Sequence, residues 1–250
     1  MVQDNAASHN CIHREVDITS MYDSGEFSKN VADGSFKGIY PGCYIIKTKT
    51  IDGVTYTDHI DMIVSLDPYY GKWNGTSHIS THHIGIVPFT LLGKSYMNSK
   101  DVTSGGFKSS YMVNTTLPKY LIGYKNAYGA DHFLTFASLI TNSINDTADA
   151  SVDGTSRSNG WEWLITQITL LSEVQVYGST IFGSSYDTGE ACNQLDAFRY
   201  KYALQNYQFG DFWLRGIAKS GYFTYSDGHG YTGFTKASSS LYVRPLLLLY

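Results

Sequence analysis

Charged residues are scarce in this sequence. Asp, Glu, Lys and Arg together make up 16% of its 250 residues, against about 25% in an ordinary globular domain. Lys and Arg form no cluster along the chain, and the formal net charge is −4. Because binding to a phosphate backbone requires a basic face, the composition argues against a nucleic-acid-binding protein.

Long apolar runs are also missing. The longest is Leu246–Leu249, far short of the roughly 20 residues that span a bilayer, so no membrane insertion is expected. The first residues do not show the basic, apolar and small-residue succession of a secretion signal. We therefore expect the chain to be made and to fold in a cytoplasm.

Cysteine is rare as well, with 3 copies at Cys11, Cys43 and Cys192. Their number is odd, they are far apart, and no C-x-x-C pair occurs. Neither a disulfide framework nor a zinc site is therefore expected. Buried free thiols are the predicted state of these side chains.

Tyrosine is the residue in excess, with 21 copies against 12 Phe and 4 Trp. Its ring supplies stiff contact area with a polar end, at a small entropic cost. Two interpretations remain open: a surface that grips a ligand, or a β-rich domain with tyrosines on half-exposed strands. A chain of this length can form one large domain or two small ones.

The sequence predicts a short helix near the N-terminus. Asp23 and Glu26 have the spacing of a capping box. Phe27 and Val31 then fall on one helical face, and Gly34 can end the helix.

Strand patterns occur on both sides of the centre of the chain. Residues 43–51 and 54–65 predict a hairpin, because Asp52-Gly53 between them tolerates the positive φ of a tight turn. Pro88 places the strand that contains it at a sheet edge or near the strand's own end. Further strands are predicted at 83–89, 174–182, 212–217, 222–225 and 242–249.

Helical patterns occupy the middle of the chain. A helix is predicted at 117–127 with Pro118 in its first turn, and Thr135 is placed to cap a helix at 136–143. Residues 161–171 have apolar side chains at helical spacing. The polar segments 145–159 and 183–193 are predicted to be surface loops. Strands, helices and strands in this order, without regular alternation, predict an α+β domain.

Two groups of residues could carry chemistry: a histidine cluster that suggests a metal site, and a His–Asp pair that suggests catalysis. His78, His82 and His83 are close in sequence, but neighbours on a strand point to opposite faces and no carboxylate follows nearby. His59 and Asp61 share one face of a strand, without a Ser or Cys in a nucleophile elbow. A structural or solvent-facing pair is therefore favoured over a catalytic one.

Two further motifs do not indicate a catalytic or cofactor site. Asp61 and Asp67 could form a carboxylate dyad, but the sequence around them does not suggest a perturbed environment. Gly228 to Gly233 fits G-x-G-x-x-G by spacing alone, and no helix follows it, so a dinucleotide site is rejected. We expect no cofactor and no metal.

The stretch from Tyr222 to Tyr242 has an unusual composition. Its aromatic residues are interleaved with Ser, Thr, Gly, Asp and His, as in antibody binding loops. Two apolar strands bracket it, which is the usual support of a binding loop. An ordinary β-meander with polar turns fits the same composition equally well.

Two short motifs frame this stretch, Phe212-Trp-Leu-Arg215 and Val243-Arg-Pro245. They resemble the W-L-R … V-R-P signature of phage-encoded C-type-lectin-like variable proteins, whose fold is of the formylglycine-generating-enzyme type. Further segments that resemble these proteins are spread over nearly the whole chain: 10–14, 33–36, 40–42, 82–88, 96–98, 131–135, 176–178 and 181–183.

The resemblance implies a C-type-lectin-like fold with antiparallel strands and two to three packed helices. In such proteins a diversity-generating retroelement often rewrites AAC codons, which then never encode Glu, Gln, Met, Trp or Lys. Residues 220–235 contain none of these types. The resemblance thus implies a variable region at about 220–242, with these candidate ligand contacts: Tyr225, Asp227, Gly228, His229, Tyr231, Gly233, Phe234, Ser239 and Leu241. Trp213, Arg215 and Arg244 are assigned to the scaffold.

The function that the resemblance implies is adhesion. The protein would be made in a host bacterial cytoplasm, displayed on the tail or head of a virion, and would bind a host cell-surface protein or glycan. Residues 36–250 would form the ligand-binding domain, and residues 1–35 a segment for attachment or for oligomerisation, for instance as a trimer. The formylglycine-making relatives need paired cysteines, which this chain does not supply, so no enzymatic activity is expected.

An alternative of another class stays open. The protein could be a structural virion protein, such as a head fibre or decoration protein. Its Tyr-rich face would then be an assembly interface with other virion proteins.

Overall fold

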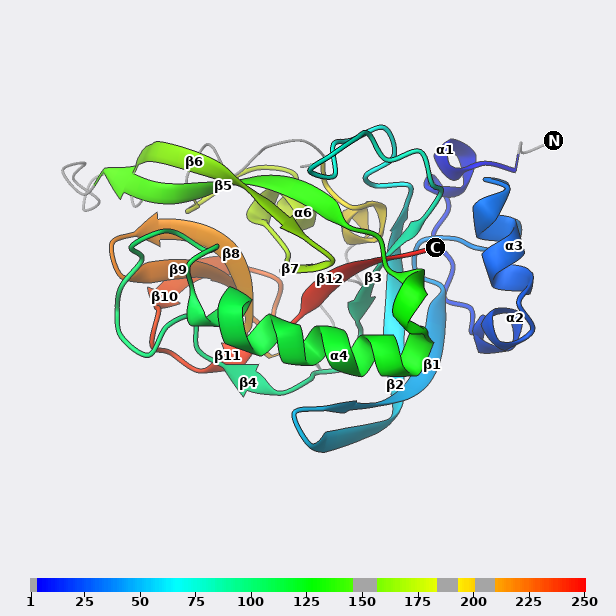
Figure 1. Cartoon of the computed structure of the whole chain (residues 1–250), viewed down its shortest axis with the longest axis horizontal. Coiled ribbons are helices and arrows are strands. Elements are labelled where there is room, and N and C mark those ends of the chain that lie inside the picture. The colour runs from blue at the N-terminus through cyan, green and yellow to red at the C-terminus, as the bar shows by residue number, and fades with distance from the viewer. Residues whose placement is uncertain (1–3, 146–156, 184–192, 201–209) are drawn as a thin grey trace.

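Two five-stranded sheets and a two-stranded ribbon make up the fold. The computed structural model describes residues 4–145, 157–183, 193–200 and 210–250 (Figure 1). The first sheet has the order β1 (Tyr44–Ile51), β2 (Val54–Leu66), β3 (Ile84–Pro88), β12 (Pro245–Leu249) and β7 (Ile168–Leu170). The second sheet has the order β10 (Thr232–Lys236), β9 (Tyr222–Ser226), β8 (Phe212–Lys219), β11 (Leu241–Tyr242) and β4 (Lys94–Ser95). The ribbon pairs β5 (Phe136–Asn145) with β6 (Arg157–Thr166).

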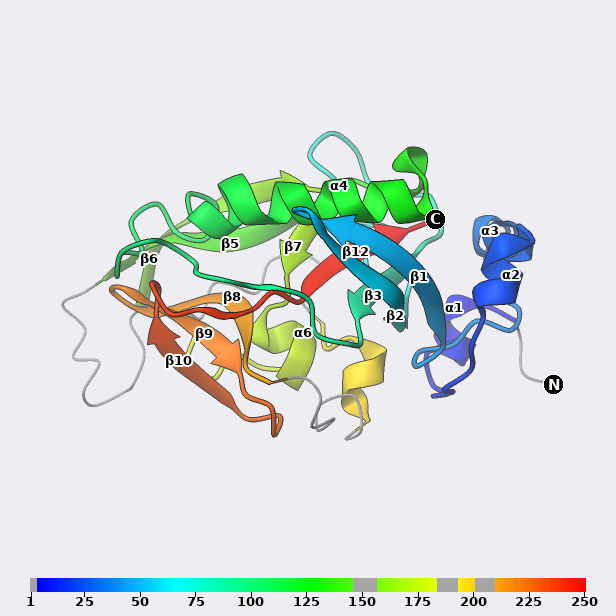
Figure 2. The ribbon, with the colours of Figure 1, turned by 90° about the horizontal axis from the view of Figure 1, so that it is seen from below.

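The helices are few and mostly short. α1 (Ala6–His9), α2 (Thr19–Asp23) and α3 (Glu26–Ala32) lie at one end of the molecule, and β8 to β10 lie at the other (Figures 1 and 2). α4 (Leu117–Tyr128) follows a π-helical turn at Met112–Thr116 and packs on β1 and β7. α6 (Glu173–Tyr177) lies beside β8, and single 3-10 turns occur at Ala130–His132 and Asp196–Arg199.

This arrangement confirms the α+β prediction. Among the described residues, the strand pairings within the sheets are antiparallel except the one between β8 and β11. The helical segments outnumber the two to three that the resemblance implies, although α1, α2 and α6 have only 4, 5 and 5 residues. Within the described chain, no helix combines the length and the apolar character needed to cross a membrane.

The apolar C-terminal run becomes an inner strand of the first sheet. β12 pairs with β3 on one side and with β7 on the other. Successive side chains of a strand point to opposite faces. Leu247 and Leu249 therefore join one buried cluster, while Leu246 and Leu248 join a second one. A strand that is covered on both faces needs an unbroken apolar sequence, and this is the pattern found here.

Several local predictions are confirmed. Ile51 pairs with Val54 across a turn in which Asp52 and Gly53 have φ of 49° and 81°, as a two-residue hairpin loop requires. The helix predicted at 117–127 is α4, with Pro118 in its first turn. The strand at 83–89 is β3, and Pro88 is its last residue.

The N-terminal helix is present, but its predicted cap is wrong. α3 buries Phe27 and Val31 as expected. Its N-cap is Gly25, at φ 80°, whereas Asp23 is the last residue of α2. Phe27 and Val31 pack in the same cluster as Ile45 of β1. The division at residue 35 and the attachment role of residues 1–35 stay predictions.

The helices predicted at 136–143 and 161–171 are wrong. Residues 136–145 and 157–166 are instead the paired strands β5 and β6, and residues 168–170 are β7. The apolar positions of β6 alternate in exposure, since Leu164 is buried while Trp161 and Ile165 are exposed. Long-range pairing of the two strands thus overrides a helix-like spacing of apolar residues.

The strand predicted at 174–182 is also wrong, because its first part is α6. Ser172 accepts a hydrogen bond from the backbone N–H of Gln175 at 3.1 Å, and the Gln175 side chain accepts one from the Ser172 N–H at 3.0 Å. This is a complete capping box. Gly178, at φ 83°, ends the helix. The sequence Ser-x-x-Gln carried this signal.

The thiol prediction holds in part. Cys43 is buried and free, as expected, whereas Cys11 is free but exposed. Cys192 and most of the two predicted polar loops, at 146–156 and 184–192, lie outside the described residues.

A buried carboxylate joins α4 to the β1–β2 hairpin. Asp61 of β2 accepts hydrogen bonds from the hydroxyls of Tyr124, at 2.9 Å, and Tyr128, at 2.6 Å, both on α4. It also pairs with the Lys49 ammonium of β1. The side chains of Lys49 and Asp61 are both 0% exposed. Three donors from two elements thus satisfy one carboxylate in the interior.

His59 completes this cluster. Its Nε2 lies 3.0 Å from the Thr90 carbonyl, and its Nδ1 lies 2.9 Å from the Lys49 ammonium. Because a carbonyl only accepts, Nε2 carries the proton and Nδ1 accepts from Lys49. His59 and Asp61 therefore form a buried structural pair, and the solvent-facing alternative is wrong.

The environment of Asp61 is strongly perturbed, contrary to the expectation from sequence. Burial alone would raise the pKa of its carboxyl, but the Lys49 ammonium more than offsets this and holds the pKa well below its usual range. Burial lowers the pKa of Lys49, and the charge of Asp61 opposes that shift. The cluster is sealed from solvent, so it has a structural role.

Replacing Asp61 by Asn tests this role. Asp61→Asn leaves the Lys49 ammonium buried without its counter-charge, so we expect the free energy of unfolding to fall by about 3–5 kcal/mol. Urea unfolding measures the loss. Asp58→Asn, at an exposed position of the same strand with φ 49°, is the matched control and should change stability by less than about 0.5 kcal/mol.

The low pKa of Asp61 predicts that the stability of the fold depends on pH. The pKa of Asp61 is lower in the folded than in the unfolded chain, so its contribution to stability is complete above the ordinary carboxyl range, near pH 4, and is lost as the pH falls further. Unfolding free energy of the parent should therefore drop more steeply in acid than that of Asp61→Asn. Parallel acid profiles for the two proteins would contradict an ionised Asp61.

Candidate binding surface

The C-terminal hairpin, β9 with β10, holds most of the candidate contacts. Its turn is fixed by Asp227, whose Oδ1 accepts from the backbone N–H of His229 at 2.9 Å and of Tyr231 at 2.8 Å. The Asp227 N–H donates to the Tyr231 carbonyl at 2.8 Å, and Gly230 has φ 85°. These bonds form an Asx-type turn that presents the residues at its tip.

Every candidate contact residue is accessible to some degree. His229 and Tyr231 are exposed, and Tyr231 reaches 70%. The other candidates are half-buried: Tyr225, Asp227, Gly228, Gly233, Phe234, Ser239 and Leu241. Some neighbouring positions of the same segment are buried: Phe223, Thr224, Ser226, Ala237 and Val243.

The structure divides the candidates between two faces and a distant strand. Tyr225 is opposite Gly233 in the register, whereas Phe234 is opposite Thr224 and therefore points to the other face. A Cβ at Gly233 would lie 2.9 Å from the Tyr225 ring, so the side chains at these two positions are not independent. Leu241 lies in β11, separated from the hairpin by β8.

Phe234 belongs to an aromatic cluster on its face of the hairpin. Its ring centroid lies 5.3 Å from that of Phe182 and 6.0 Å from that of Tyr222. The Lys219 ammonium stands 4.4 Å from the Tyr222 centroid and 4.9 Å from the Phe234 centroid. Sequence reasoning missed Phe182 and Lys219, because they come from other segments of the chain.

Glu173 of α6 links this face of the hairpin to the rest of the domain by hydrogen bonds. Its carboxylate accepts from the backbone N–H groups of Ile181, at 3.0 Å, Phe182, at 3.1 Å, and Gly183, at 2.7 Å. The Thr232 hydroxyl of β10 donates to it at 2.9 Å. Glu173 is 2% exposed. One buried carboxylate thus joins α6, the segment 181–183 and the hairpin, and no sequence pattern indicates this link.

The residues assigned to the scaffold are buried below this surface. The Trp213 indole N–H donates to the Ser95 carbonyl at 2.8 Å, which joins β8 to β4. The Arg244 Nε–H donates to the Pro88 carbonyl at 3.0 Å, and its guanidinium lies 5.0 Å from the Phe212 ring centroid. Arg215 is 1% exposed. These positions support the scaffold assignment, which stays a prediction.

The three histidines considered for a metal do not gather around one. The His82 Nδ1 lies 2.6 Å from Asp67 Oδ2, and the His83 ring bonds to the Thr81 carbonyl and to the Tyr69 N–H. Asp67, which precedes the three histidines in sequence, thus supplies a carboxylate next to His82. Within the described residues, no group of three or more His, Cys, Asp or Glu side chains could hold a metal ion.

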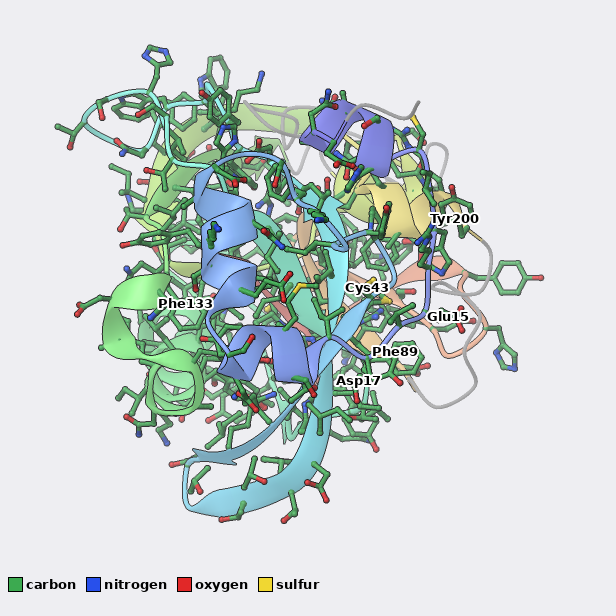
Figure 3. The ribbon with its side chains drawn as sticks, turned by 90° about the vertical axis from the view of Figure 1, so that its right-hand side faces the viewer. Glu15, Asp17, Cys43, Phe89, Phe133 and Tyr200 are labelled. Carbon is green, nitrogen blue, oxygen red and sulfur yellow. The ribbon has the colours of Figure 1, made fainter. Side chains whose placement is uncertain are left out.

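A small pocket lies on another side of the molecule. Glu15 and Phe89, labelled in Figure 3, border a space of about 210 Å³ whose other walls are largely apolar. Ligand sites usually exceed about 300 Å³. With one carboxylate and little room, this pocket is a weaker candidate than the hairpin.

Comparisons with family models, with curated proteins and with solved structures find no match for this chain. The function must therefore be argued from the residues and their arrangement.

Removing the charge of Glu173 tests its role in fastening the hairpin. In Glu173→Gln an amide NH₂ faces some of the N–H donors that the carboxylate now accepts, so we expect a loss of about 1–3 kcal/mol in unfolding free energy. Amide hydrogen exchange should become faster at Phe182 and Gly183. Glu26→Gln, at an exposed position of α3, is the control, and equal exchange in the two variants would contradict the role.

Proposed function

We propose that this chain is a phage-encoded C-type-lectin-like protein that is displayed on the virion and binds a host cell-surface protein or glycan through its C-terminal hairpin. The observation that carries the proposal is accessibility: every residue nominated as a contact is exposed or half-buried, and Tyr231 at the tip is 70% exposed, whereas Phe223, Thr224 and Ser226 of the supporting strand β9 are buried. A surface that tolerates sequence change needs this separation of framework and contact residues.

The contact chemistry fits a recognition surface. Tyr231 and His229 project from a turn whose backbone Asp227 holds, so the tip loses little entropy when it binds. Tyr supplies large contact area and His an adaptable hydrogen-bonding group. Weak single sites would gain strength from many copies on one particle. The proposed role is adhesion, without catalysis.

Truncating the aromatic contacts tests the proposal. With Tyr225, Tyr231 and Phe234 changed to Ala, we expect adsorption of the purified protein to host cells to fall at least about tenfold, because aromatic anchors usually dominate an interface. The matched control is Tyr70→Ala with Tyr250→Ala, two exposed tyrosines outside the hairpin. Undiminished adsorption of the triple variant would refute adhesion through this surface.

The structural alternative is tested with the same triple variant, by asking whether phage particles assemble with it. If the triple variant folds but phage particles no longer assemble with it, the hairpin is an assembly interface and the protein is a structural virion protein.

For the diversification itself, the neighbouring DNA should carry a near-copy of the segment that encodes residues 220–242, differing almost only at adenines, beside a reverse transcriptase gene.

A further inference from the structure

A cleft of about 410 Å³ lies apart from the hairpin contacts. The turn of the β1–β2 hairpin, β4 and the start of α4 form its walls, and Ser240 closes one side. Figure 1 shows β4 and the turn of the β1–β2 hairpin below α4. The volume falls within the range of about 300–1,000 Å³ that is common for small-molecule sites.

Tyrosine dominates the lining, with Tyr56, Tyr96, Tyr111 and Tyr120. The Tyr120 hydroxyl donates to the Gly93 carbonyl at 3.1 Å. A Cβ at Gly93 would lie 3.2 Å from the hydroxyl oxygens of both Tyr56 and Tyr120, so the two phenol groups converge at this glycine. Burial raises the pKa of Tyr120 and Tyr56, so both hydroxyls stay protonated at neutral pH.

The outer tyrosines are held in place before any ligand binds. The ring centroids of Tyr96 and Tyr111 lie 4.7 Å apart, and the Tyr111 backbone N–H donates to Asn98 Oδ1 at 2.9 Å. Groups that are already ordered cost less entropy when a ligand arrives. The cleft therefore offers preformed aromatic faces.

The charges around the cleft favour a ligand with a negative charge. Lys94 and Lys119 line it together with one acid, Asp52. Lys119 Nζ lies 2.9 Å from Asp52 Oδ2, and Lys94 Nζ stands 4.4 Å from the Tyr242 ring centroid. Two ammonium groups against one carboxylate leave a positive excess, which disfavours the cationic ligands that aromatic cages otherwise bind.

The remaining lining is rich in hydroxyl groups. Ser95 Oγ lies 2.9 Å from Thr116 Oγ1, and Ser240 is exposed beside them. A wholly apolar ligand would cover the exposed Ser240 hydroxyl and offer it no partner, which is costly. A ring with apolar C–H faces and many hydroxyls at its edge matches both the phenol faces and the hydroxyl donors and acceptors.

We propose that this cleft binds a saccharide unit that carries a carboxylate group. The sugar ring lies against the tyrosine faces, and its carboxylate approaches the ammonium of Lys119. The site goes beyond the proposed adhesion through the C-terminal hairpin and does not depend on it.

Calorimetric titration of the full chain tests the proposal with defined sugars. Sialyllactose and trigalacturonate are the acidic probes, which distinguish a sialic-acid source from a uronic-acid source, and lactose is the neutral comparison. At least one acidic probe should bind about tenfold more tightly than lactose, as expected for a charge-assisted contact. The difference should shrink at high salt.

Two variants assign the binding to the cleft. Lys119→Gln should bring the affinity for the acidic probe down to that for lactose, because it removes the ammonium and leaves the Asp52 carboxylate without its partner. Tyr111→Ala should weaken acidic and neutral sugars alike. Tyr250→Ala is the matched control, since Tyr250 and Tyr111 are each 37% exposed, and it should bind as the parent does. Thermal unfolding verifies that each variant is folded.

The proposal is overturned if neither acidic probe binds, if lactose binds equally well, or if folded Lys119→Gln and Tyr111→Ala bind the acidic probe as the parent does. These results are independent of cell adsorption, so a failure of the hairpin proposal would leave this test intact.

Discussion

The buried carboxylate of Asp61 is the constraint on which much of the architecture depends. An ionised group in the interior must be surrounded by donors, and here Lys49, Tyr124 and Tyr128 supply them from β1 and α4. Satisfying the charge fixes α4 against the β1–β2 hairpin. The turn of that hairpin and the start of α4 are also two walls of the tyrosine cleft. A structural interaction in the core thereby sets the shape of a surface site.

Glu173 repeats this principle beside the C-terminal hairpin. Its buried carboxylate draws together three backbone N–H groups of one segment and the Thr232 hydroxyl of another. The hairpin is therefore supported from below, while its tip at His229 and Tyr231 stays exposed. A rigid base under an accessible tip keeps the entropic cost of recognition low.

The excess of tyrosine turns out to serve several purposes. Tyr124 and Tyr128 are buried donors to Asp61, Tyr111 lines a cleft, and Tyr231 projects from a turn. Composition alone cannot separate these roles, because the same phenol suits a satisfied core, an aromatic wall and an exposed anchor. Only the neighbours of each ring decide which role it has.

Local chemistry is enough to predict several features from the sequence. Asp52-Gly53 specified a tight hairpin turn, Pro118 suited the first turn of α4, and Leu246–Leu249 specified a strand. Long-range contacts account for the other elements. Residues 136–145 and 157–166 became strands because they pair with each other, and Glu173 meets Thr232 only in the folded chain. Such long-range contacts outweigh local preference, because pairing and burial contribute more free energy than intrinsic propensity does.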